Sequence, residues 1–362
     1  MATIKVASTD DWKDDAFERL RAGRLVAFPT ETVYGLGAHA KDEAAVRRIF
    51  EYKGRPLDDP VIVHVHSVAA ARALVDLSDD ESVVFEALAS SCWPGPLTIV
   101  STAQPDVPLV VRADGPTVGV RVPSNSTARA LLEHTNVPIA APSANTFGHV
   151  SPTTADHVFA DLGSHDILII DDGPCDVGVE STVARVHNRA VTVLRRGGTS
   201  VEALKAAVET CPWAVEVSVK VGVGPSSLAP GQHLKHYAPG NAPAFVVRSE
   251  AEVEIVAESV AVPLGECGVL DIGGNLAGLR GRVRHYHDLT AEGDTTVAAR
   301  GIYAGLRGLE AHALSAILLP DVSGLASSLH GPDSKSLDDK LFRASQGRYA
   351  MIRSGSAITD VQ

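Results

Sequence analysis

The chain has 362 residues, of which 45% are apolar and 21% charged, and it carries a formal net charge of −12. These values are typical of a soluble globular protein with two or three domains, and so acidic a chain lacks the broad positive surface of a nucleic-acid-binding protein. The four cysteines are far apart with no CxxC pair, which argues against a disulfide framework and a thiolate zinc site. Because no signal peptide or membrane-length apolar run is present, we expect a cytoplasmic protein with no membrane partner.

Strand and helix patterns alternate through the first 210 residues. Short apolar runs predict strands at 24–28, 61–65, 97–101, 118–122, 137–141, 166–170, 181–186 and 191–194. Amphipathic patterns predict helices after residues 9–10 and 42, and near 68–76, 80–91, 126–134, 153–161 and 200–209. This interleaving predicts an α/β domain with a largely buried sheet.

The composition changes after residue 210. Residues 211–243 include a stretch rich in proline and glycine, which is typical of a linker, although it also carries histidines, a lysine and a tyrosine. Beyond it, strands are predicted at 244–248, 267–272, 283–286 and 314–319, and helices at 297–311 and 337–345. We therefore predict a first domain at 1–210, a linker at 211–243 and a second, smaller α/β domain at 244–362.

The tetrapeptide KGRP, residues 53–56, ends one predicted helix and carries two cations beside a glycine. An arginine fork, a lysine ammonium and an accessible glycine backbone suit phosphate groups. Basic residues also occur at helix C-termini because they interact favourably with the helix dipole, so the motif alone leaves both interpretations open. Arg121, Arg195 and Arg196 end further predicted strands, and these cations would form a basic pocket if the ends converge.

Two loops place short polar side chains directly after a predicted strand, where α/β proteins commonly bind ligands. The first is PTETVYGLG, residues 29–37, whose hydroxyl groups suit a small polar molecule. The second carries Ser143 and Asn145, which suit phosphate oxygens or the water ligands of magnesium. Each loop is also explained as a turn that caps the helix after it.

Several common catalytic motifs are absent from the sequence. There is no GxxxxGK[ST], GxSxG or HExxH, and GLG at residues 35–37 lacks the third glycine of a dinucleotide-binding fingerprint. His64 and His66 share one face of a predicted strand, but no third ligand lies nearby in the sequence. This pattern favours histidines in a core or a pocket lining over a metal site.

Taken in order, the motifs of the first 210 residues resemble those of the threonylcarbamoyl-adenylate synthase family, whose catalytic domain is called YrdC-like. They are FPTETVYGLG, KGRP followed by PVIVHV, WPGPLT, VGVRVP, APSAN followed by SP, and ESTV. The whole chain resembles the long form of the family, in which a linker with a sequence like PGQHLKHYAP leads to a Rossmann-like domain. The resemblance implies a catalytic domain with a twisted mixed sheet and a concave basic cleft.

The resemblance also implies a reaction. L-Threonine captures bicarbonate as N-carboxythreonine, which attacks the α-phosphorus of ATP to give threonylcarbamoyl-AMP and pyrophosphate. A separate tRNA threonylcarbamoyl transferase machinery then uses this product to modify an adenosine beside the anticodon. Such phosphoryl transfer depends on positioning and charge neutralisation rather than on a protein nucleophile.

The resemblance carries roles over to individual residues. Lys53, Arg55, Ser143 and Asn145 would be catalytic and would hold the triphosphate with its Mg²⁺. The other nucleotide-binding residues would be Asp59, Thr117, Ser151, Arg195, Gln232, His236 and Tyr237. L-Threonine would be surrounded by Thr32, His64, Arg121, Ala141 and Ser181, with Arg121 pairing with its carboxylate. The linker would fold over the cleft as a lid that keeps water from the labile carbamate.

One residue departs from the family pattern, and two alternative functions remain. Asp59 stands where relatives often have asparagine, and a carboxylate near a triphosphate is unfavourable unless it meets magnesium. A double-stranded RNA-binding module without catalysis is the main alternative function, but the charge of −12 argues against strong direct tRNA binding. A carbamoyl-transfer domain of the hydrogenase-maturation type is the other, but it usually carries zinc-finger cysteines and an acylphosphatase segment, which this sequence lacks.

Overall fold

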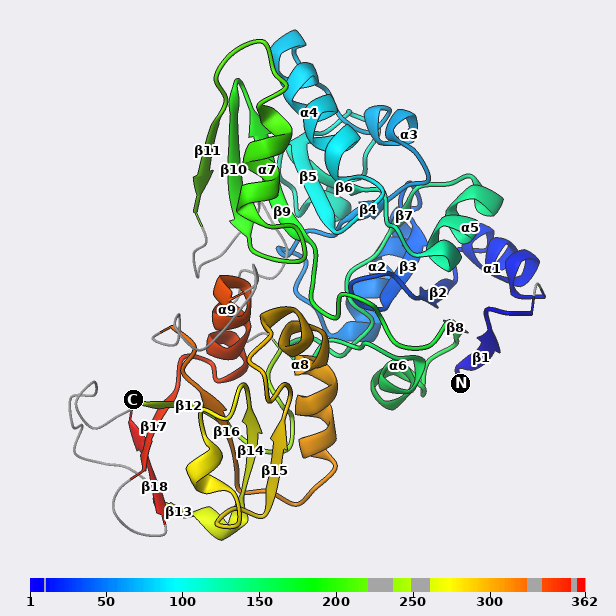
Figure 1. Cartoon of the computed structure of the whole chain (residues 1–362). Helices are drawn as coiled ribbons and strands as arrows, with labels where there is room; N and C mark the ends of the chain where they lie inside the picture. The colour runs from blue at the N-terminus through cyan, green and yellow to red at the C-terminus, as the bar shows by residue number, and fades with distance from the viewer. Residues whose placement is uncertain (10, 221–236, 249–260, 324–333, 353–356, 362) are drawn as a thin grey trace. The chain divides into compact units, whose positions relative to one another are not determined.

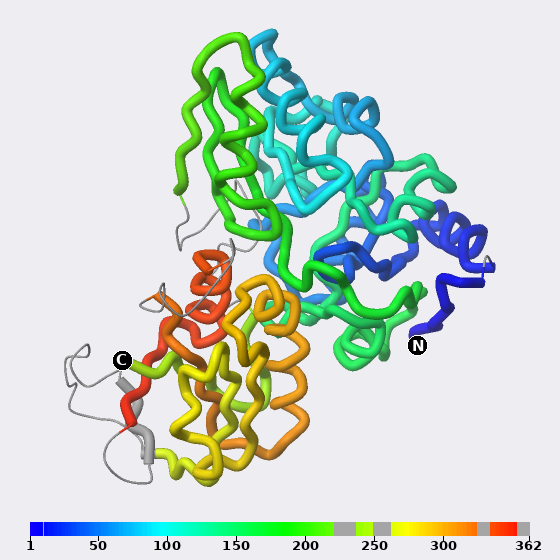
Figure 2. The backbone as a smooth tube through the Cα atoms, viewed as in Figure 1, coloured from blue at the N-terminus to red at the C-terminus, as the bar shows by residue number. Residues whose placement is uncertain are grey.

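The structure, a computed structural model, describes residues 1–9, 11–220, 237–248, 261–323, 334–352 and 357–361 (Figure 1). Contacts within the chain divide it into two compact units, and Figure 2 shows the backbone path through them. The first unit consists of Met1–Phe147 and Ser151–His233, and the second of Gly148–Val150 and Leu234–Gln362. The boundaries predicted at residues 210 and 243 stay a proposal.

A mixed sheet organises the first unit. Its strands are β1 (Thr3–Val6), β2 (Leu25–Phe28), β3 (Gly35–His39), β4 (Val63–His64), β5 (Leu97–Thr102), β6 (Thr117–Arg121), β7 (Ile139–Ala140), β8 (Ile167–Asp171), β9 (Thr182–His187), β10 (Ala190–Arg195) and β11 (Glu216–Val219). Within the described residues these eleven strands follow the order β1-β8-β2-β3-β7-β4-β6-β5-β9-β10-β11. Parallel pairs such as β4 with β6 and antiparallel pairs such as β5 with β6 both occur. The predicted α/β class with a mixed sheet is therefore confirmed.

The helices of the first unit begin at residues that can cap them. They are α1 (Trp12–Arg21), α2 (Glu43–Lys53), α3 (Val68–Arg72), α4 (Asp79–Cys92), α5 (Ser126–Thr135), α6 (Ala155–Leu162) and α7 (Val201–Val208). The Asp42 side chain accepts a hydrogen bond from the Ala45 amide, and Ser78 and Glu81 form a capping box. Such caps satisfy backbone N–H groups that have no partner inside the helix, so they help to fix where α2 and α4 begin.

Two hydrophobic clusters cover the two faces of the sheet near β2 and β8. Leu25 and Ala27 belong to the larger cluster with α2, whereas Val26 and Phe28 belong to a second cluster with α1 and α5 (Figure 1). Successive side chains of a strand point to opposite faces, so β2 is buried on both sides. Every residue of β2 is accordingly apolar, which is why a short unbroken run predicted this strand correctly.

The sequence patterns missed strands β1, β3 and β11 of the first unit, and three short strands at 261–263, 349–352 and 357–361 of the second. Residues 35–39 of β3 read GLGAH, with little intrinsic strand preference. A side chain at Gly37 would come within 2.7 Å of the Ile139 side chain, so glycine allows close packing there. β11 pairs in parallel with β10, and residues 216–219 therefore extend the sheet rather than forming the extended connection that the composition predicted.

The second unit contains a smaller sheet. Its strands are β12 (Ala244–Arg248), β13 (Ala261–Pro263), β14 (Cys267–Asp271), β15 (His285–Asp288), β16 (Ala316–Pro320), β17 (Tyr349–Ile352) and β18 (Ala357–Val361), and its helices are α8 (Thr295–Glu310) and α9 (Ser334–Ala344). In the described part of this unit the strand order is β13-β18-β17-β12-β16-β14-β15. The pairs among β17, β12, β16, β14 and β15 are parallel, while β18 and β13 add antiparallel edges. Over the residues that can be described, no helix is long and apolar enough to cross a membrane.

Candidate active site

The end of α2 places Lys53 against the loop that follows β7. Gly54 adopts the left-handed conformation (φ 63°), which ends the helix and turns the chain. The Lys53 ammonium then donates to the backbone carbonyls of Ser143, at 2.6 Å, and of Asn145. Two of the predicted phosphate-binding segments, KGRP and SAN, therefore lie in direct contact.

Lys53 is buried, with only 1% of its surface exposed. Burial, and secondarily the nearby Arg55 cation, hold the pKa of the Lys53 ammonium well below its ordinary value. Lysine is almost never fully buried without a compensating partner. The chain therefore keeps a costly charge in a place where an anionic ligand would stabilise it.

Asp59 forms an ion pair with Arg55. The Arg55 Nη2 atom lies 2.9 Å from the Asp59 carboxylate and 2.8 Å from the Pro60 carbonyl oxygen, and both charged side chains are buried. A guanidinium held by fixed oxygens keeps one orientation. The structure thus gives Asp59 a role beside Arg55 that the sequence had left open.

Arg121 and His64 come together because β6 and β4 are neighbours. The two residues are register partners in this parallel pair and stand at the carboxyl ends of their strands. Arg121 donates from Nη1 to the Thr32 hydroxyl at 3.0 Å and from Nε to the Gly95 carbonyl at 3.2 Å. Its Nη2 atom lies 2.7 Å from a Glu31 carboxylate oxygen. Three of the predicted threonine-binding residues are therefore gathered at one place in the sheet.

Glu31 is a residue to which sequence reasoning gave no role. Its side chain is buried; burial raises the pKa of its carboxyl, but the charge and hydrogen bond of Arg121 outweigh this, so that the pKa lies below its ordinary value. The signal was present in PTETVYGLG, where a glutamate follows a buried strand directly. Only the structure shows that the partner of this glutamate is an arginine 90 residues later in the sequence.

His64 is a buried, neutral imidazole. Burial, together with the positive charge of Arg121, lowers its pKa to about 3. Its ring packs edge-to-face against Phe28, with ring centroids 5.8 Å apart. The described residues contain no group of three or more His, Cys, Asp or Glu side chains that could hold a metal ion; the choice of a core or pocket-lining histidine over a metal ligand stays a prediction.

Ser181, directly before β9, and Arg195, at the end of β10, form another group of contacts. Arg195 donates to both the backbone carbonyl and the hydroxyl of Ser181, at 3.0–3.1 Å. The Ser181 hydroxyl also lies 2.8 Å from that of Thr98 on β5. Ser151 donates to the Glu180 carboxylate at 2.7 Å. Like Glu31, Glu180 is a buried carboxylate without a predicted role.

The segment 141–145 links these groups. The Ala141 amide donates to the Ile62 carbonyl at 2.9 Å, just before β4. Ser143 forms an isolated antiparallel bridge with Gly35, directly after the loop that carries Glu31 and Thr32. Segments far apart in the sequence therefore converge here. The concave shape and basic character of the expected cleft stay predictions.

Other predicted site residues are not brought into these contacts. Thr117 begins β6 and Arg121 ends it, so the two are about 13 Å apart along the strand at 3.3 Å per residue. Tyr237 is buried in the second unit, its ring centroid 5.3 Å from that of Tyr303. Gln232 and His236 lie outside the described residues, so the predicted lid over the nucleotide stays a prediction.

The chemical character of the gathered residues is clear. Lys53, Arg55 and Arg121 are buried cations held by oxygens, and hydroxyl groups accompany them. Buried charged groups that cost folding energy cluster at functional sites. This arrangement can bind and orient an anionic ligand by electrostatic contacts.

Comparisons with known proteins identify the family. A family model described as "Telomere recombination", for Sua5, YciO and YrdC proteins, matches residues 18–197, and one described as "Threonylcarbamoyl-AMP synthase, C-terminal domain" matches residues 199–345. Threonylcarbamoyl-AMP synthase of Pyrococcus abyssi is 44% identical over 224 residues, which are 61% of this chain and 63% of that protein. The Bacillus subtilis enzyme of the same name is 39% identical over 241 residues, or 66% and 67% of the two chains.

A solved structure extends the likeness to both units. The crystal structure of P. abyssi Sua5 complexed with L-threonine is similar over 98% of this chain and all of that chain, with a TM-score of 0.80 and 31% sequence identity. The alignments of curated sequences cover about two thirds of those relatives, whereas the structural match covers the whole P. abyssi chain. The chain therefore belongs to the threonylcarbamoyl-AMP synthase family, in its long form with a C-terminal domain.

Proposed function

We propose that this protein is an L-threonylcarbamoyladenylate synthase. The amine of L-threonine attacks the carbon of bicarbonate-derived CO₂ and loses a proton, which gives N-carboxythreonine. A carbamate oxygen then forms a bond to the α-phosphorus of ATP, while the bond between the α-phosphorus and the oxygen that bridges it to the β-phosphate breaks. The products are threonylcarbamoyl-AMP and pyrophosphate, so the transfer is a nucleotidyl transfer.

The observation that carries this proposal is the environment of Arg121. Its guanidinium is fixed by Thr32, Gly95 and Glu31, next to the neutral imidazole of His64. A held guanidinium pairs well with an amino-acid carboxylate, and the similar P. abyssi protein has been solved with L-threonine. We assign the carboxylate of threonine to Arg121, with Thr32, His64, Ser181 and the backbone of Ala141 around the rest of the molecule.

The triphosphate is assigned to the region around Lys53. Lys53 and Arg55 supply positive charge and the backbone around Ser143 and Asn145 lies against them. Mg²⁺ usually binds substrate phosphates, waters and only one or two carboxylates. We therefore treat it as part of the ATP substrate, where it neutralises charge on the departing pyrophosphate. Thr117, Ser151, Arg195, Gln232, His236 and Tyr237 are proposed to complete the nucleotide site.

Binding of the triphosphate should stabilise the charged form of Lys53. Burial keeps the pKa of this ammonium low in the unliganded protein, whereas four negative charges nearby would raise it again. A bound triphosphate would therefore stabilise the charged form of Lys53, where phosphoryl transfer needs positive charge. The arrangement places electrostatic stabilisation at the reacting phosphates without a protein nucleophile.

The product requires a second catalyst. Threonylcarbamoyl-AMP is an activated mixed anhydride, and we propose that a separate tRNA threonylcarbamoyl transferase machinery in the cytoplasm consumes it. Strong direct binding of tRNA to this chain is not part of the proposal, because the net charge is −12.

Mass analysis tests the proposed reaction directly. The full chain is incubated with ATP, Mg²⁺, L-threonine and bicarbonate, and the adenylate product and pyrophosphate are measured while each component is omitted in turn. Threonylcarbamoyl-AMP should form only in the complete mixture. Product that forms equally with serine or without bicarbonate would contradict the assignment, and tight salt-sensitive tRNA binding without small molecules would favour the RNA-binding alternative.

A further inference from the structure

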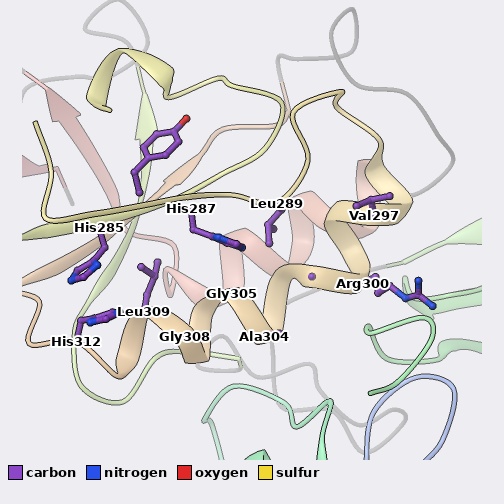
Figure 3. Close-up of a pocket in the computed structure, with 12 residues that line it drawn as sticks. His285, His287, Leu289, Val297, Arg300, Ala304, Gly305, Gly308, Leu309 and His312 are labelled. Carbon is purple, nitrogen blue, oxygen red and sulfur yellow. The ribbon is translucent and has the colours of Figure 1, made fainter. Parts of the chain in front are cut away.

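The second unit contains a cavity of about 680 Å³ between strand β15 and helix α8 (Figure 3). Three histidines, an arginine, a tyrosine and small or aliphatic residues line it: His285, Tyr286, His287, Leu289, Val297, Arg300, Gly301, Ala304, Gly305, Gly308, Leu309 and His312. This volume is within the range of ordinary ligand-binding sites. The proposed synthase activity uses none of these residues.

Glycines on α8 shape the cavity. A Cβ at Gly301 would come within 2.9 Å of the Leu289 side chain, and one at Gly305 within 2.5 Å of the Leu270 side chain. These two glycines therefore let the helix pack closely against the sheet. A Cβ at Gly308 would meet nothing within 4 Å, so the missing side chain there leaves open space. The glycines of α8 thus shape the groove, although each of them lowers the helix propensity of this segment.

β15 is an edge strand. Within the described residues it pairs with β14 alone, in parallel, and stands at the end of the seven-stranded sheet. One side of its backbone therefore retains N–H and C=O groups that are not used in the sheet. An extended segment that lies in the groove would be in a position to pair with these groups.

The side chains give the groove one charge sign. His285, His287 and Leu289 point from the strand segment toward α8, and His312 stacks on His285 with ring centroids 3.6 Å apart (Figure 3). Arg300 lies toward the other end of the groove (Figure 3). None of the twelve described residues that line it carries a carboxylate, although the chain as a whole has a net charge of −12.

The length of the groove indicates an elongated ligand. Val297 and Leu309, which both lie on α8 and line the groove, are separated by roughly 18 Å at 1.5 Å per helical residue, and an extended chain of about five or six residues has that length. Addition of a strand to an exposed sheet edge beside a groove is a recurring mode of peptide recognition. We propose that this groove binds an extended acidic peptide segment of a partner protein, which adds to β15 as a further strand.

Charge also distinguishes this occupant from a nucleic acid. The pKa of the His285 imidazole is lowered by burial, by His312 and by Arg284, and Arg300 is the one lysine or arginine among the described residues that line the groove. Nucleic-acid affinity depends on many phosphate contacts made by full charges. A peptide needs fewer, because backbone hydrogen bonds to the strand supply much of its affinity.

A binding selection tests the proposal. Random peptides of about eight residues, long enough to span the groove, are selected on the full-length protein, and individual binders are measured by fluorescence anisotropy. Enriched peptides should contain Asp or Glu in an alternating pattern with apolar residues. Gly308→Phe, which fills open space, should weaken binding at least tenfold. Gly278→Phe is the matched control, since a Cβ there also meets nothing within 4 Å and Gly278 does not line the groove, and it should leave binding unchanged.

Two further measurements test the mode of binding. Gly308→Glu should weaken binding about fivefold more than Gly308→Gln, which has the same size but no charge. N-methylation of single peptide amides should abolish binding at every second position and have little effect at the positions between, because only every second amide of a strand faces its neighbour. All these variants should form pyrophosphate at the normal rate, so failure of the synthase assignment would be seen separately.

Three outcomes would overturn the proposal. The first is enrichment of peptides without acidic residues or binding that Gly308→Phe leaves unchanged. The second is salt-sensitive binding of a tRNA anticodon stem-loop that is lost in Gly308→Phe, which would assign the groove to RNA. The third is a dimer, detected by sedimentation, that this variant dissociates, which would make a second copy of the chain the occupant.

Discussion

The buried cations of the candidate active site and the exposed Arg300 of the β15–α8 groove differ in how they are held. Lys53, Arg55 and Arg121 are each at least 93% buried and contact carbonyl or carboxylate oxygens. Arg300 of the groove is exposed. Burial of a charge costs several kcal/mol, roughly, unless it is well paired, whereas an exposed cation costs little. The first arrangement suits chemistry on a bound anion, and the second suits recognition of a partner.

This difference also makes the candidate active site rigid and the groove adaptable. A buried guanidinium with three directed contacts cannot rotate without breaking them, so Arg121 is fixed before substrate arrives. The groove is open over Gly308 and can accept side chains of different size. Substitutions in the first unit should therefore change turnover or stability strongly, and equivalent substitutions in the groove should change neither.

Removal of the Lys53 charge should have the largest effect. Lys53→Met retains the packing of the stem but not the ammonium, so pyrophosphate formation should fall at least about 100-fold, as when a transition-state donor is lost. The melting temperature should change little, because loss of a poorly solvated charge offsets the loss of its hydrogen bonds. Pyrophosphate release and calorimetry measure the two quantities.

Arg300→Met is the matched control for Lys53→Met. It removes an exposed cation of the second unit, and both turnover and melting temperature should stay as in the natural protein. Near-normal pyrophosphate formation by Lys53→Met would contradict the assignment of the triphosphate to Lys53. A large loss of turnover or of melting temperature in Arg300→Met would show instead that the buried and the exposed cations do not differ as described.

Replacement of Glu31 by glutamine should destabilise the protein. Glu31→Gln leaves the Arg121 cation buried without its carboxylate, at a cost of about 3 kcal/mol in unfolding free energy. L-Threonine should then stabilise the variant more than the natural protein, because its carboxylate replaces the missing charge. Denaturant unfolding with and without threonine measures both effects, and equal stabilisation of the two proteins would argue against threonine binding at Arg121.

The ion pair of Glu31 with Arg121 also makes the stability of the protein fall at acidic pH. The pKa of Glu31 is lowered in the folded protein from an ordinary value of 4.5. Its contribution is therefore present above about pH 4.5 and is lost as the pH falls through the lower folded pKa. Glu31→Gln lacks this contribution at every pH, so the stability difference between the two proteins should shrink below pH 4.5.

Asp59 offers a smaller test of the same idea. Asp59→Ala frees the guanidinium of Arg55 from its carboxylate at 2.9 Å, so Arg55 loses orientation but keeps its charge. We expect KM for ATP to rise about tenfold with a smaller change in kcat, since binding geometry changes more than the reacting groups do. A double-mutant cycle with Arg55→Ala measures the coupling. Independent, additive effects of the two substitutions would remove the positioning role.

The sequence predicted what is local and missed what depends on packing. β2 was found because four consecutive apolar residues are buried on both faces, and α2 because Asp42 caps it. β3 was missed since GLGAH has the composition of a turn, and the close approach of the Ile139 side chain, which explains Gly37, cannot be read from the sequence. The tertiary fit overrides local propensity there.

The site shows the same division. Ordered motifs identified Lys53, Ser143 and Arg121 before any contact was known, and the structure brings Lys53 to Ser143 at 2.6 Å. The pairing of Glu31 with Arg121 joins residues 90 positions apart. No periodicity or spacing contains that information, because the strand order that brings them together results from the whole sheet.

The ionisation of His64 should be seen only in the pH dependence of stability. Its pKa is about 3 in the folded protein and near 6.5 when unfolded, so protonation favours the unfolded chain. Stability should therefore fall as the pH decreases from 6.5 toward 3, with a slope of up to about 1.4 kcal/mol per pH unit from this one group. In His64→Gln the slope between pH 6.5 and 5 should be lower by that amount, whatever the variant's stability at neutral pH. Equal slopes would mean that the imidazole is solvated, and a solvated His64 could not line a dry site beside Arg121.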